Sequence, residues 1–145
     1  MSESLMLMRI RPDAIVDADR EGLRSFLTAR RLHQEGDTLF NEDGSFFVFE
    51  DDDASELSID SLDSSEPVTA YWGRFCPGKE EFRFLYDLCV AAGFLIITPY
   101  DNPSLVVVNH NHREADLVNI HGEMPNTVWV ENPDELAAVF GGTWN

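Results

Sequence analysis

The sequence predicts an α+β protein: a single domain in which about three helices pack on a mixed, mostly antiparallel β-sheet. Three observations favour this class. Short apolar runs typical of strands alternate with segments that have helical spacing or helix caps. Turn residues separate neighbouring strands, as in hairpins. The 145 residues also match the size of one domain with its own core.

The first elements are a strand and a helix. Residues 4–11 are rich in apolar side chains on both faces and predict a strand. Residues 17–33 predict a helix, because their leucine and phenylalanine residues form an apolar stripe and Asp17 or Asp19 can cap its N-terminus.

A hairpin and an acidic loop are expected next. The Asp43-Gly44 pair predicts a turn between short strands over 38–40 and 45–50, because this dipeptide accepts positive φ. Residues 51–66 predict a mostly exposed acidic loop within the domain. Three apolar residues can hold part of that loop down as a short edge strand: Leu57, Ile59 and Leu62.

The second half contains the strongest patterns. A strand over 68–72, a helix over 79–92 and a strand over 94–98 predict a crossover between parallel strands. The continuous apolar run over 105–108 predicts a second central strand, joined to 94–98 by a hairpin. Weaker strands are expected over 116–120 and 127–131.

The last helix is predicted from its cap. Asn132 is a good N-cap, Pro133 suits the first helical position, and Glu135 can reach back to the cap. The pair Gly141-Gly142 is expected to end the helix.

Charge is the most unusual property of the chain. There are 27 acids against 10 lysines and arginines, a net charge of −17. Such a surface repels nucleic acid and anionic membranes and attracts basic proteins. We therefore expect a basic protein partner, no direct nucleic-acid binding and no membrane association. The chain has two cysteines, Cys76 and Cys89, and no secretory signal, which favours the reducing cytoplasm.

No catalytic motif or family signature stands out. The chain lacks the nucleophile-elbow, phosphate-loop, dinucleotide and paired-cysteine motifs, so an enzyme is the less favoured expectation and no cofactor is predicted. The weak candidates for metal binding are His110, His112 and His121. If the segment is extended, His110 and His112 point the same way and could share a zinc ion with a third ligand.

The acidic residues are concentrated in one tract. Residues 35–66 hold twelve acids and no base, and they bracket Phe46, Phe47 and Phe49. Because side chains alternate along a strand, at least one phenylalanine must face away from the others, where it could lie among carboxylates. An aromatic anchor ringed by charge is typical of a protein interface. The predicted contact residues are Glu42, Asp43, Phe47, Phe49, Glu50, Asp51, Asp52 and Asp53.

Three functions follow as hypotheses. The first is an acidic binding or inhibitory module that neutralises a basic toxin or nuclease, by analogy in size and charge with bacterial immunity proteins. The second is a DNA mimic that regulates a nucleic-acid-binding protein, which requires carboxylates spaced like phosphates. The third is a small metal-binding or ligand-binding enzyme that uses residues 110–123.

Overall fold

The computed structural model describes residues 3–12, 14–47, 56–75, 79–100, 103–117 and 126–144. The strands are β1 (Glu3–Arg11), β2 (Ala14–Val16), β3 (Leu32–Glu35), β4 (Thr38–Asn41), β5 (Glu56–Ile59), β6 (Ala70–Phe75), β7 (Leu95–Ile97), β8 (Leu105–Val108) and β9 (Thr127–Val130). The helices are α1 (Arg20–Ala29), α2 (Lys79–Ala92), α4 (Pro133–Trp144) and the short 3-10 helix η1 (Glu114–Leu117).

Most strands belong to one mixed sheet. Its order is β5-β6-β1-β7-β8-β9, and β2 pairs with the end of β1. All neighbouring pairs are antiparallel except β8 and β9. Strands β3 and β4 form a separate antiparallel hairpin. The predicted α+β class, with a mostly antiparallel sheet, is confirmed.

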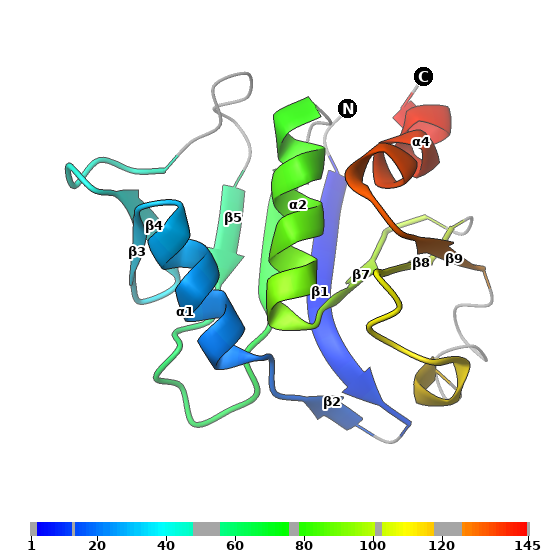
Figure 1. Cartoon of the computed structure of the whole chain (residues 1–145), viewed down its shortest axis with the longest axis horizontal. Helices are drawn as coiled ribbons and strands as arrows, with labels where there is room; N and C mark the ends of the chain where they lie inside the picture. The colour runs from blue at the N-terminus through cyan, green and yellow to red at the C-terminus, as the bar shows by residue number, and fades with distance from the viewer. Residues whose placement is uncertain are drawn as a thin grey trace.

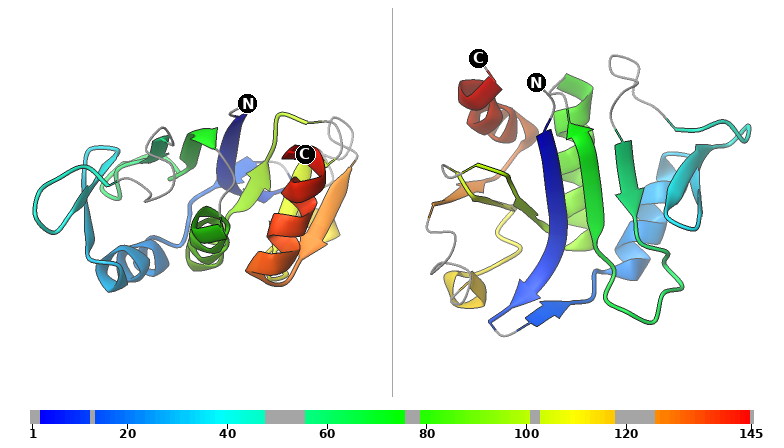
Figure 2. Two further views of the ribbon diagram at one scale, coloured as in Figure 1. Left: turned by 90° about the horizontal axis from the view of Figure 1, so that it is seen from above. Right: turned by 180° about the vertical axis from the view of Figure 1, so that it is seen from behind.

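Three helices cover one face of the sheet. Helix α2 lies centrally, between α1 and α4, and the main core lies between these helices and the strands (Figure 1; Figure 2, left). Alternation along β1 explains the layering: Leu5 and Leu7 are fully buried toward the helices, whereas Met6 points to the other face and is 48% exposed. The predicted bounds of α2 are confirmed, because its apolar residues recur at helical spacing over the whole segment.

The opposite face is only partly covered. A second apolar cluster lies there, beside η1: Met8, Ile10, Leu95, Leu105, Val107 and Leu117. Farther along the same face, toward β5 and β6, Met6 and Tyr71 are each about half exposed. This side shows no overlying helix along β1 and β6 (Figure 2, right).

The predicted crossover is also confirmed. Strands β6 and β7 each pair antiparallel with β1, so they run parallel to each other with β1 between them. Helix α2 joins them, and β7 and β8 form the predicted hairpin. No helix in the described part of the chain is both long and apolar enough to cross a membrane.

The first helix is shorter than predicted. The helix expected over 17–33 spans Arg20–Ala29, with the Asp19 carboxylate accepting a hydrogen bond from Gly22 N at 2.9 Å as the N-cap. Arg31 has a φ of 58°, which ends the helical path, and Leu32 begins β3. The predicted helix was too long because Leu32 continues the apolar stripe of a helix and also suits the buried face of a strand.

Strand β4 pairs with a different strand from the one predicted. Strand β4 pairs with β3 through a turn at Gly36, which has a φ of 63°. The segment expected as the second strand, 45–50, contributes an isolated bridge between Phe46 and Phe40, and residues 48–50 lie outside the described part. The Asp43-Gly44 turn does form, with Gly44 N donating to Asn41 O at 3.0 Å.

One smaller prediction is confirmed and two need correction. The short edge strand expected within the loop over 51–66 is β5, which contains Leu57 and Ile59, while 51–55 lie outside the described residues. The strand expected over 116–120 is wrong for Asp116 and Leu117, which belong to η1, and 118–120 lie outside the described residues. The glycine pair Gly141-Gly142 does not end the last helix, which continues to Trp144.

Candidate functional site

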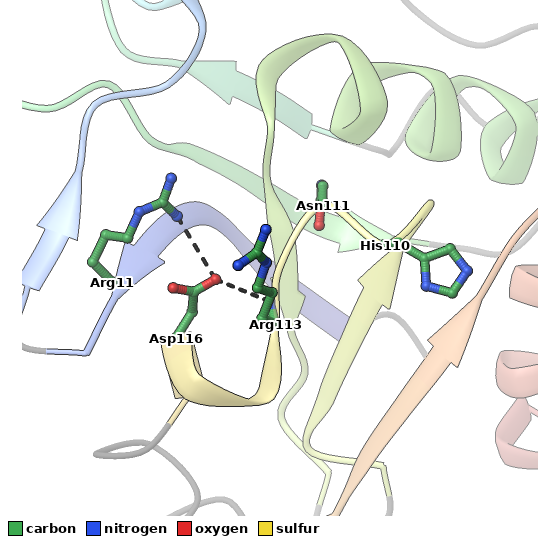
Figure 3. A pocket seen from close by; sticks show the side chains of 5 residues that line it. All are labelled: Arg11, His110, Asn111, Arg113 and Asp116. Carbon is green, nitrogen blue, oxygen red and sulfur yellow. Dashed lines mark hydrogen bonds and ion pairs between the residues drawn. The ribbon is translucent and has the colours of Figure 1, made fainter.

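The histidines at 110 and 112 do not form a shared site. Asn109 and His110 have φ values of 49° and 52°, so the chain turns after β8 and is not extended as predicted. The His110 ring is exposed, contacts the Glu131 carboxylate, and points away from Asp116 (Figure 3). His121 lies outside the described residues, and those residues hold no group of three metal-ligating side chains.

His112 instead holds the backbone together. It is 2% exposed, and its Nε2 accepts a hydrogen bond from Ile10 N at 3.1 Å. Its Nδ1 lies 2.7 Å from Asn111 Oδ1. Burial lowers the pKa of His112 to about 4, so the ring stays neutral and can accept that bond at neutral pH. This geometry does not favour His112 as a metal ligand shared with His110.

Apart from Glu56 on β5, the described acids of the tract form two groups. One group lies on the β3–β4 hairpin and the turn after it: Glu35, Asp37, Glu42 and Asp43. The other lies on the loop between β5 and β6, residues 60–69, which we call the acidic loop: Asp60, Asp63 and Glu66. The two groups differ in how many of their contacts lie within the protein.

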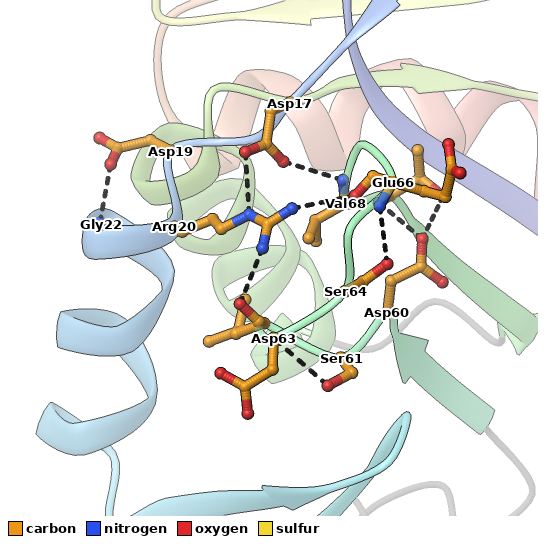
Figure 4. Close-up of polar contacts among 12 residues, drawn as sticks. Asp17, Asp19, Arg20, Gly22, Asp60, Ser61, Asp63, Ser64, Glu66 and Val68 are labelled. Atoms are coloured by element: carbon orange, nitrogen blue, oxygen red, sulfur yellow. Dashed lines mark hydrogen bonds and ion pairs between the residues drawn. The ribbon is translucent and has the colours of Figure 1, made fainter.

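The acidic loop is fastened to helix α1. The Arg20 guanidinium donates to Asp17 Oδ2 at 2.8 Å and to the carbonyl oxygens of Leu62 and Glu66, each at 2.9 Å (Figure 4). Asp60 Oδ2 accepts hydrogen bonds from the backbone N–H and the hydroxyl of Thr69, at 2.9 and 3.1 Å. Of the three acids of this loop, Asp60 therefore supports the fold with its carboxylate, whereas Asp63 and Glu66 are exposed.

The hairpin presents an aromatic row on its outer face. His33 is paired with Phe40 across the strands, and Phe40 is bridged to Phe46. The rings stack in that order, with centroids 5.6 and 5.1 Å apart and interplanar angles of 21° and 27°. Phe46 ends the row and is 68% exposed, more than any other large apolar side chain in the described part of the chain.

Phe47, one of the predicted contact residues, packs inward. Because neighbours alternate along an extended segment, Phe47 faces inward and stacks on Phe84 with centroids 5.4 Å apart. Its backbone N–H donates to Leu39 O at 3.1 Å. The exposed aromatic expected among the carboxylates is therefore Phe46, and Phe47 packs against the core.

Carboxylates lie beside the aromatic row. Glu35 is 3.9 Å from His33 Nε2, and Glu42 is 3.9 Å from Arg31 Nη1, both as exposed pairs. Asp43 Oδ1 accepts hydrogen bonds from the Ser45 hydroxyl and backbone N–H, at 2.5 and 2.9 Å. The Ser45 hydroxyl is the main cause that lowers the pKa of Asp43, so this carboxylate stays charged in mildly acidic solution.

We call this surface the hairpin patch; it comprises His33, Glu35, Phe40, Glu42, Asp43 and Phe46. Stacked rings with an exposed π-face and neighbouring carboxylates suit a guanidinium or ammonium group of a binding partner. None of these groups is enclosed in a way that would activate it as a nucleophile or a general base. The patch is equipped for binding.

Two of the predicted contact residues, Glu42 and Asp43, lie on this patch. The predicted contacts that fall outside the described residues are Phe49, Glu50, Asp51, Asp52 and Asp53. Prediction missed His33, Phe40 and Phe46 as a set, because they come from three segments that only the fold brings together. Comparisons with protein-family models, with curated proteins and with solved structures find no match to this chain.

Proposed function

We propose that this chain is an acidic binding module that docks on a basic protein through the hairpin patch and blocks that protein's function, in the manner of an immunity protein. One observation carries the proposal. Phe46 is 68% exposed at the end of a stacked row, and carboxylates flank the row. Leaving a phenylalanine in water is unfavourable by about 1.5–3 kcal/mol relative to burying it, and a partner that covers it recovers that free energy.

The charge of the chain supports the same partner class. A net charge of −17 steers a basic protein toward the surface, and the exposed carboxylates of the hairpin then pair with its arginines or lysines. The aromatic row can stack under a guanidinium, which favours a partner that presents arginine. The expected mechanism is rapid encounter followed by burial of Phe46.

The site of action in this proposal is the reducing cytoplasm. Cys89 is a free thiol and is fully buried in the core, where burial raises its pKa and makes it unreactive. A buried reduced cysteine suits a compartment that keeps thiols reduced.

Capture of the partner from source cells, followed by measurements with the purified partner, tests the proposal. We expect a protein of high isoelectric point to bind the wild-type chain, and Phe46→Ala to weaken the affinity about tenfold or more. The double variant Glu35→Gln/Glu42→Gln is expected to slow association, and the association rate is expected to fall as salt rises.

The acidic loop provides a matched control. Asp63→Asn/Glu66→Gln removes the same number of exposed charges, and Asp63 has a weak ion pair with Arg24 at 3.7 Å that resembles the one of Glu42. This control is expected to bind as the wild type does, apart from the small general effect of net charge. Equal losses in the two double variants, or unchanged affinity in Phe46→Ala, would exclude the hairpin patch as the contact surface.

A further inference from the structure

The end of β1 lies on the other side of α2 from the β3–β4 hairpin (Figure 1). A polar cavity is present there, beside η1. Its volume is about 380 Å³, and it is lined by Arg11, His110, Asn111, Arg113 and Asp116. Two of the chain's ten basic residues therefore lie around one cavity, against a single lining carboxylate. This local excess of positive charge is the reverse of the charge of the whole chain.

The lining carboxylate is already engaged. Asp116 Oδ2 accepts a hydrogen bond from Arg113 N at 2.9 Å and lies 3.9 Å from Arg11 Nη1 (Figure 3). Its side chain is 17% exposed, whereas that of Arg11 is 44% exposed. The long contact with Arg11 neutralises that guanidinium only in part.

The guanidinium of Arg113 is available to a ligand. Arg113 is exposed, and across the residues that the structure describes its side chain has no ion pair or hydrogen bond. The other two lining groups are committed elsewhere: His110 contacts Glu131, and Asn111 Nδ2 donates to Phe94 O at 2.7 Å. A ligand would therefore meet mainly the two arginines.

Hydrogen bonds hold the backbone of the cavity wall in place. The buried His112 ring ties the segment over 110–113 to β1 through Ile10 N, and the Asn111 amide ties it to the end of α2. Arg113 then precedes η1, whose Asp116 N donates back to Arg113 O at 2.9 Å. The two guanidinium groups thus extend from parts of the fold that hold their positions without a ligand.

From this geometry we infer that the cavity binds a small oxyanion, the carboxylate or phosphate group of a small molecule. Guanidinium groups are planar and recognise the oxygens of both groups through paired hydrogen bonds. A volume of about 380 Å³ exceeds one inorganic ion and fits a small metabolite. This site is independent of the hairpin patch, and neither proposal depends on the other.

Titration with inorganic phosphate and with acetate, followed by amide NMR shifts, tests the inference. Sodium chloride at matched ionic strength separates binding from screening. We expect saturable shifts at the amides of Asn111 and Arg113 with at least one of the two anions. Tighter binding of phosphate assigns a phosphoryl ligand, and tighter binding of acetate assigns a carboxylate ligand.

Variants of Arg113 complete the test. Arg113→Gln is expected to weaken anion binding about tenfold or more, since a hydrogen bond to a charged group is lost. Arg113→Lys keeps the charge and is expected to lose less. Arg83→Gln makes the same charge change on the exposed side of α2 and is expected to bind normally. Shifts that never saturate, or that sodium chloride reproduces, overturn the inference, as does equal weakening in Arg83→Gln.

Discussion

The acidic loop and the hairpin patch both carry several acidic residues, but their surroundings differ. In the acidic loop, Asp60 accepts two hydrogen bonds from Thr69, and Arg20 ties the loop carbonyls to helix α1. In the hairpin patch, Glu35 and Glu42 have only exposed pairs at 3.9 Å, and Phe46 lies largely in solvent. Charge in a sequence therefore does not distinguish a carboxylate that holds the fold from one that faces a partner.

The difference has a structural origin. The acidic loop connects β5 to β6 across the end of α1, so its backbone groups must find donors and acceptors near the main core. The hairpin extends from the sheet edge, and only its inner face, with Leu32 and Leu39, is buried. Its outer face is left to solvent, which makes it the freer surface for recognition.

Removal of the Arg20 side chain is expected to have the largest effect on stability. Arg20→Ala deletes three hydrogen bonds of 2.8–2.9 Å and leaves the Leu62 carbonyl with only the 3.3 Å contact to Arg24. We expect the free energy of unfolding to fall by about 2–3 kcal/mol, measured by urea denaturation. The control is Arg31→Ala on the hairpin, expected to change stability by about 0.5 kcal/mol or less. Equal effects of the two substitutions would remove the distinction between the regions.

Phe46 and Phe47 are neighbours that face opposite sides of the hairpin, so their substitutions are expected to affect stability differently. Phe47→Ala removes a ring that stacks on Phe84 in the core and is expected to cost about 2 kcal/mol. Phe46→Ala removes an exposed ring and is expected to change the free energy of unfolding by about 0.5 kcal/mol or less. Thermal and urea unfolding of both variants measure the difference. A larger loss for Phe46→Ala would show that the outer row stabilises the fold and is not kept for a partner.

The regular elements of the second half were predictable because their patterns are long. Helix α2 has apolar residues at helical spacing over fourteen residues, and β8 is a continuous apolar run between turns. The boundary between α1 and β3 was not predictable, because Leu32 fits both the helical stripe and the inner face of the hairpin. The spacing of apolar residues alone could not show whether Leu32 belongs to the helix or to the strand.

The functional surfaces depend on contacts between distant segments. Alternation predicted that at least one of the phenylalanines faces away from the others, but it could not say which until the inner face of the hairpin was known. Likewise, Arg20 donates to the carbonyl oxygens of Leu62 and Glu66, which are more than forty positions away in the sequence. The cavity is lined by both Arg11 and Arg113, which are still farther apart in the sequence. Such pairings follow from the topology of the sheet and leave no spacing signal in the chain.

Asp17 allows the smallest and most specific test of the acidic loop's structural role. The backbone N–H of Val68 is the main cause that lowers the pKa of Asp17, and Arg20 lowers it further. Because the folded state favours the charged form, Asp17 contributes stability above its ordinary pKa. That contribution is lost as the pH falls through the lowered value. Asp17→Asn is expected to cost about 0.5–1 kcal/mol at neutral pH, a small value because the carboxylate is 47% exposed.

The pH dependence separates Asp17 from the other acids of the chain. The difference in unfolding free energy between wild type and Asp17→Asn is expected to be constant above about pH 5 and to shrink below about pH 4. All other carboxylates titrate in both proteins, so the difference isolates this one. Glu42→Gln on the hairpin patch serves as the comparison and is expected to change the unfolding free energy by less than about 0.5 kcal/mol at neutral pH, because its ion pair with Arg31 is long and exposed. A difference that stays constant down to pH 2, or one of equal size for Glu42→Gln, would mean that Asp17 does not fasten the acidic loop through its charge.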